Sequence, residues 1–142
     1  MLHYFIDSDV IIDFLGDRKP FAKAASRIFI NAQNKEIKLY TSGNSVNITY
    51  YILCKTIPEK AARSLIPVLL KYVHVIPVTE KILTEASLSE FKDFEDAVQH
   101  FSAISEAKIT AIITRNVKDF KKSIPALAVV TPQQLLKLFH EN

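Results

Sequence analysis

Short runs rich in β-branched and aromatic residues alternate along the sequence with longer segments of helical periodicity. The expected strands are residues 2–6, 37–42, 73–78, 109–114 and 127–131. The expected helices are residues 9–16, 20–35, 44–55, 58–72, 79–90, 93–108 and 131–139. Strands that alternate with helices are typical of a parallel sheet, because parallel neighbours need a long crossover connection. We therefore expect an α/β fold with a mainly parallel, five-stranded sheet.

Length and composition restrict the class of protein. A chain of 142 residues, 49% hydrophobic and 23% charged, fits a single folded domain spanning residues 1–142. Two glycines and one cysteine argue against a glycine-rich nucleotide loop and an internal disulfide framework. A net charge of +3 is compatible with a nucleic-acid partner. Without a signal peptide or a long apolar run, we expect a soluble cytoplasmic protein with no membrane partner.

The segment FIDSDVIIDF, residues 5–14, places three carboxylates within an apolar run. Charged side chains are seldom buried unless they are paired or bound to a ligand. Asp9 suits the capping position of the first helix, and Asp13 suits an exposed helical position. Asp7 directly follows the first strand, where ligands bind in open parallel sheets.

Other polar residues are expected at the same edge of the sheet as Asp7. Asn116 and Asp119 follow the fourth strand, and Asp96 begins the helix that leads into that strand. Carboxylates gathered at one edge repel each other unless a cation holds them, and Mg²⁺ and Mn²⁺ prefer oxygen ligands. Taken singly, Asp96 could be a first-turn acid and Asp119 a turn residue. Their shared location favours a metal site.

Lys118, Lys121 and Lys122 form a small basic patch beside these acids. A solvated surface is the ordinary interpretation of such a patch, and contact with a substrate phosphate is the alternative.

Three segments together resemble a known family. They are FIDSDVIIDFL, DFEDAVQHFSAISEAKITAIITRNVKDF and VVTPQQLL, and in this order and spacing they are similar to a PIN domain. The resemblance extends from residue 2 to about residue 138. It is greatest to stand-alone bacterial PIN proteins similar to VapC-type toxin ribonucleases. It implies a Rossmann-like three-layer α/β/α sandwich and a Mg²⁺- or Mn²⁺-dependent endoribonuclease.

The resemblance also assigns roles to individual residues and partners to the chain. It implies catalytic roles for Asp7, Asp96, Asn116 and Asp119, with the three aspartates as metal ligands. It places three further residues close to the metal, namely Ser8, Asp9 and Asn47. Arg115 and Lys118 are candidates for contacts with RNA phosphates. The implied partners are an RNA substrate, an antitoxin protein and a second copy of the chain.

One carboxylate of the family pattern is missing. Many PIN nucleases have a glutamate in the helix after the second strand, where this chain has Asn47 or Ile48. Residues 37–58 contain no carboxylate at all. This departure motivates an alternative function, an inactive PIN scaffold that binds RNA or a protein.

A phosphatase of the haloacid dehalogenase type is a further alternative. Its first motif is a strand followed by Asp-x-Asp, which here would make Asp7 the nucleophile and Asp9 the general acid. The later paired-acid motif of such enzymes is poorly matched by TRNVKDF, residues 114–120.

Overall fold

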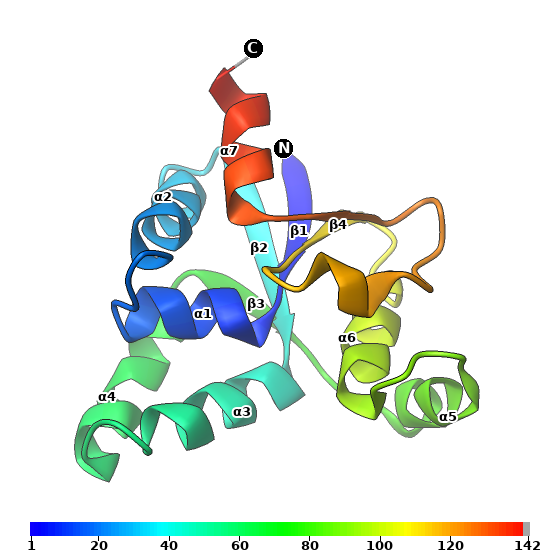
Figure 1. Ribbon diagram of the computed structural model, residues 1–142, viewed down its shortest axis with the longest axis horizontal. Helices are drawn as coiled ribbons and strands as arrows, with labels where there is room; N and C mark the ends of the chain where they lie inside the picture. Colours follow the sequence, from blue (N-terminus) through cyan, green and yellow to red (C-terminus); the bar gives the residue numbers. More distant parts are fainter. Residues whose placement is uncertain (141–142) are drawn as a thin grey trace.

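The computed structural model describes residues 1–140 and contains one five-stranded sheet with helices on both faces (Figure 1). The strands are β1 (Leu2–Ile6), β2 (Ile37–Ser42), β3 (Val73–Ile76), β4 (Ile109–Ile113) and β5 (Ala128–Val130). Their order is β3-β2-β1-β4-β5, and every neighbouring pair is parallel. The structure confirms the expected α/β fold with five parallel strands.

Seven α-helices and one 3₁₀ helix accompany the strands in the described chain, and the last of these helices follows the last strand. They are α1 (Ser8–Leu15), α2 (Ala22–Gln33), α3 (Gly43–Leu53), α4 (Glu59–Leu70), α5 (Glu80–Leu88), α6 (Phe94–Ile104), η1 (Val117–Phe120) and α7 (Pro132–His140). Helices α1, α2, α3, α4 and α7 lie toward one side of the sheet, and α5 and α6 toward the other (Figure 1). No helix within residues 1–140 is long and apolar enough to cross a bilayer.

Capping side chains explain where several helices begin. Ser42 begins α3 by accepting a hydrogen bond from the Ser45 amide, and Thr79 begins α5 by accepting one from the Ile82 amide. The prediction that Asp9 caps α1 is wrong. Asp7 occupies the capping position instead, and Asp9 lies in the first turn.

Two apolar clusters fix the sheet between its helical layers. On one face, Ile6 and Leu39 pack among side chains of α1, α2 and α7. On the other face, Phe5 and Ile112 pack against α6 and the fully buried Phe120 of η1. Because successive strand residues point to opposite faces, the buried pair Phe5 and Ile6 contributes to both clusters.

The central strands β1 and β4 are direct neighbours, although about 100 residues separate them in the sequence. The ladder continues past the end of β1, because the Asp7 amide donates to the Ile113 carbonyl at 2.9 Å. The loop after β4 therefore lies beside the beginning of α1, and this junction positions the candidate site.

Candidate active site at the carboxyl edge of the sheet

Asp7 lies at the centre of the site and is almost fully buried. Its Oδ1 accepts hydrogen bonds from the Ser8 amide at 2.8 Å and from Gln99 Nε2 at 3.1 Å. Its Oδ2 accepts one from the Thr114 hydroxyl at 2.9 Å. Burial raises the pKa of Asp7 above its usual value, and the charge of Asp119 raises it further. The three hydrogen bonds lower this pKa and so offset part of the increase.

Gln99 connects Asp7 to the beginning of α3 through a buried network. Its Oε1 accepts from the Ser42 hydroxyl at 2.6 Å, and its Nε2 also contacts the Ser45 hydroxyl. All three side chains are fully buried, so these contacts satisfy polar groups that water cannot reach. Sequence reasoning missed Gln99, although it follows Asp96 by three residues and so shares its helix face.

Thr114 was also missed by sequence reasoning, and strand pairing explains its position. Ile6 is opposite Ile113, so Thr114 is the residue level with Asp7. The sequence offered one signal for Thr114: it is a polar residue directly after a strand, as Asp7 is after the first strand. Thr114 is fully buried and donates to Asp7, which makes it part of the same site.

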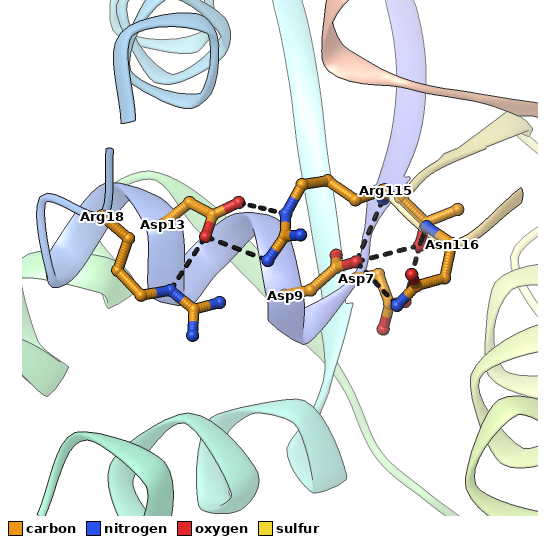
Figure 2. Close-up of polar contacts among 7 residues, drawn as sticks. Asp7, Asp9, Asp13, Arg18, Arg115 and Asn116 are labelled. Carbon is orange, nitrogen blue, oxygen red and sulfur yellow. Dashed lines mark hydrogen bonds and ion pairs between the residues drawn. The ribbon is translucent and has the colours of Figure 1, made fainter. Parts of the chain in front are cut away.

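Asp9 lies beside Asp7 in the first turn of α1 (Figure 2). Its Oδ2 accepts from the Arg115 amide at 3.0 Å and from Asn116 Nδ2 at 3.3 Å. Its Oδ1 is buried and has no hydrogen-bond partner within the described residues. Burial, followed by the Asp7 charge, raises the pKa of Asp9 to about 7.

Asp13 is buried in an ion-pair cluster, so the expectation of an exposed position is wrong (Figure 2). Its carboxylate accepts from Arg115 Nε at 2.6 Å and from Arg18 Nε at 2.9 Å. The Arg115 guanidinium also lies over the Phe21 ring, 3.9 Å from its centroid. The Arg115 side chain therefore joins the loop after β4 to α1, and the proposed contact with RNA stays a prediction.

Asp96 faces the site from the first turn of α6. Its amide is capped by the Asp93 carboxylate at 3.3 Å, which sets the start of the helix. Burial and the charges of Asp7, Asp93 and Asp119, in that order, raise the pKa of Asp96 to about 7. The charges of Asp7 and Asp119 therefore both act on Asp96, as expected for residues at one edge of the sheet.

Asp96 and Asp119 line one cavity of about 310 Å³ between the start of α6 and η1. We call it the lysine cavity because four lysines also line it, namely Lys92, Lys118, Lys121 and Lys122. The predicted basic patch thus borders the same cavity as two of the predicted metal ligands. Asn47 lies elsewhere, in a separate groove that it lines with Glu95.

The donor set fits an oxygen-preferring divalent cation. Within residues 1–140, no three His, Cys, Asp or Glu side chains are arranged closely enough to hold a metal ion as they stand. However, Asp9 has a buried oxygen without a partner, and burial, followed by neighbouring carboxylates, raises the pKa values of Asp7, Asp9 and Asp96. A cation beside these oxygens would satisfy the unpaired atom and remove the repulsion.

Comparisons with known proteins agree with this architecture. A curated relative, Ribonuclease VapC1 of Aquifex aeolicus (strain VF5), is 32% identical over 136 residues, which cover 92% of this chain and 90% of the relative. The structure of VapBC2 from Rickettsia felis, bound to a promoter DNA fragment, matches with a TM-score of 0.67 at 16% identity. That match covers 92% of this chain and 98% of the other.

A toxin-antitoxin complex from Klebsiella pneumoniae matches with a TM-score of 0.65 at 23% identity. It covers 91% of this chain and 97% of the other. A family model described as a PIN domain matches residues 3–118, which include β1 from its second residue, all of β4, and Asp7, Asp9 and Asp96. With most of its length matched by that model, this chain belongs to the PIN domain family.

Proposed function

We propose that this protein is a divalent-metal-dependent endoribonuclease of the PIN type. The observation that supports it most directly is the buried, unpartnered Oδ1 of Asp9 beside the raised pKa of the Asp7 carboxyl. A buried carboxylate oxygen without a partner and a carboxyl group with a raised pKa would both be stabilised by a bound cation. The name of the 32% identical relative, a ribonuclease, supports RNA as the substrate.

Asp7, Asp96 and Asp119 would hold the metal, which we take to be Mg²⁺ or Mn²⁺ because the ligands are carboxylate oxygens. A divalent cation there supplies charge neutralisation at a phosphodiester and a bound water of lowered pKa. Helix α3 contains no carboxylate, so it contributes no acid to the site.

The surrounding residues hold the acids in position. Gln99 and Thr114 donate to opposite oxygens of Asp7, so its carboxylate plane is fixed before any ligand binds. Asn116 donates to Asp9 Oδ2 and leaves Oδ1 available. Lys118 lines the cavity beside Asp119, where its ammonium group would attract a phosphate of the substrate.

We further propose that the protein acts as a toxin paired with an antitoxin protein. Support comes from the structural matches to VapBC2 of Rickettsia felis and to the Klebsiella pneumoniae toxin-antitoxin complex. On the same likeness, we propose a cytoplasmic location and a homodimer. Co-purification of the chain with the product of an adjacent reading frame, and loss of cleavage in that complex, would test the pairing.

Isothermal titration of Mg²⁺ and Mn²⁺ tests the proposed nuclease site. The wild-type protein should bind at millimolar or lower concentration, and the double variant Asp7→Asn with Asp96→Asn should not. The wild type should then cleave single-stranded RNA in the presence of either metal and stop when EDTA is added. Metal-independent RNA binding without cleavage would instead support the inactive-scaffold alternative.

A further inference from the structure

A second hollow borders the start of α6, on the side away from the lysine cavity. We call it the α3–α6 groove, and its volume of about 500 Å³ is in the range of small-molecule sites. Six of the residues that line it carry the argument: Asn44, Asn47 and Ile48 of α3, Val78, and Phe94 and Glu95 of α6. The groove and the lysine cavity share the first turn of α6, where Glu95 lines one and Asp96 the other.

An exposed aromatic side chain stands at the beginning of this groove. Phe94 is the first residue of α6, lies two positions before Asp96 and is 52% exposed. Its ring is thus close in sequence and structure to a proposed metal ligand, yet it is not covered by the core. Exposed aromatic rings beside a phosphate-binding site are the usual platforms on which single-stranded bases stack.

Helix α3 provides amide groups on the other side. Asn44, Asn47 and Ile48 are at positions i, i+3 and i+4, so they share one face of α3. Each asparagine offers hydrogen-bond donors and an acceptor, the combination needed to pair with the edge of a nucleobase. Ile48 and Val78 add apolar surface beneath them.

The charges of the two hollows indicate which part of a nucleic acid each would take. Among the nine residues that line the α3–α6 groove in the described chain, Glu95 is the one charged side chain, and it is acidic. The lysine cavity is lined by four ammonium groups and by four carboxylates, those of Glu90, Asp93, Asp96 and Asp119. The groove therefore offers no cation to a phosphodiester and suits a neutral planar base, whereas the cavity offers lysine ammonium groups beside the proposed metal ligands.

We propose that the α3–α6 groove is a nucleobase subsite, in which a base of a single-stranded RNA stacks on Phe94 and pairs with Asn44 or Asn47. The inference extends the proposed ribonuclease function, since it concerns how the same site selects its substrate. The RNA backbone crosses the first turn of α6, with its phosphates on the lysine side.

Equilibrium binding tests the subsite without relying on cleavage. The full-length protein is titrated in EDTA with a fluorescent hexamer of RNA and with a hexamer of abasic ribose phosphates of equal charge. The wild type should bind the base-bearing strand at least about fivefold more tightly, the effect of one stacked base. Phe94→Ala should abolish this preference, and Phe94→Tyr should retain it because the stacking surface remains.

Leu88→Ala is the matched control, because Leu88 is an apolar side chain that is 81% exposed and does not line the groove. This variant should keep the preference for bases. Equal binding of both strands by the wild type, or an unchanged preference in Phe94→Ala, would overturn the proposal. So would a change from dimer to monomer in Phe94→Ala with the preference intact, which would identify the groove as a protein interface.

The two proposals fail separately. If the wild-type protein cleaves RNA with Mg²⁺ or Mn²⁺ but shows no preference for bases, the nucleobase subsite is contradicted and the nuclease proposal stands. A protein that prefers bases through Phe94 but cleaves nothing with either metal is not the proposed nuclease, and the groove remains an RNA-binding site.

Discussion

Arg115 and Asp13 lie 102 residues apart in the sequence, and their side chains form a two-contact ion pair. Arg115 Nε is 2.6 Å from Asp13 Oδ2, and Nη2 is 3.3 Å from Oδ1. Asp13 is only 1% exposed, whereas the Arg115 side chain is 25% exposed. The pair fastens the loop that contains Asn116 to helix α1, and so connects the stability of the fold to the shape of the site.

Replacing Asp13 should therefore destabilise the protein. Asp13→Ala removes the partner of both Arg115 and Arg18 and leaves a partly buried guanidinium unpaired. We expect a loss of about 2–4 kcal/mol in the free energy of unfolding, measured by urea denaturation. Glu85→Ala is the control, because Glu85 pairs with Lys81 at 3.9 Å on the surface, and it should cost less than about 0.5 kcal/mol. Similar losses in both variants would contradict this account.

Asp7→Asn should abolish metal-dependent RNA cleavage, with a loss of at least about 100-fold, because the central carboxylate charge is removed. The fold should persist, since asparagine still accepts a hydrogen bond, and circular dichroism would verify this. Asp17→Asn changes an exposed acid outside the site, at a left-handed backbone position that asparagine tolerates. It should cleave RNA at the wild-type rate. Undiminished turnover in Asp7→Asn would remove Asp7 from the site.

Stability without metal should decrease as the pH rises. The pKa values of Asp9 and Asp96 are raised from 3.8 to about 7, so the folded protein binds protons more tightly than the unfolded chain. The free energy of unfolding must then fall between about pH 4 and pH 7 and level off above that range. In EDTA, the melting temperature should be lower at pH 8 than at pH 5, by at least about 3 °C.

Added Mg²⁺ or Mn²⁺ should reverse most of this decrease at pH 8, because a cation stabilises the ionised carboxylates. Asp9→Asn should flatten the pH dependence measured in EDTA, since one of the carboxyl groups with a raised pKa is gone. A melting temperature that rises from pH 5 to pH 8 in EDTA would contradict the raised pKa values of Asp9 and Asp96.

Gln99→Met should move the pH dependence of cleavage. The variant keeps the side-chain volume but removes the amide that donates to Asp7, a hydrogen bond that lowers the pKa of this carboxyl. The acidic limb of the rate profile should shift to higher pH, and stability should fall by about 1–3 kcal/mol because Ser42 and Ser45 lose a partner. An effect on stability without a shift in the profile would limit Gln99 to a structural role.

The sequence was sufficient to predict the strands and the edge at which the acids meet. Residues 37–42 were predicted as a strand with the bounds that the structure shows, because a short run rich in strand-forming residues ends at a serine that caps the next helix. Asp7 and Asp119 were predicted at one edge because parallel strands end together. Both conclusions depend on local pattern and on one topological rule.

Pairings between distant residues could not be predicted in this way. Nothing near Asp13 in the sequence indicates that Arg115 will neutralise it, so an exposed position was the reasonable local expectation. Gln99 and Thr114 are polar residues in apolar surroundings, and their role appears only when β1 and β4 pair and α6 packs over them. Which of several polar residues becomes buried is decided by tertiary packing.

The adjacency of β1 and β4 has a consequence for protein synthesis. Asp7 leaves the ribosome early. Thr114, which donates a hydrogen bond to Asp7, and Asp119, whose charge raises the pKa of Asp7, emerge more than 100 residues later. At about 5–20 residues per second, the growing chain spends roughly 5–20 s with only part of the site in existence. The proposed nuclease site is therefore incomplete until translation of the chain is nearly finished.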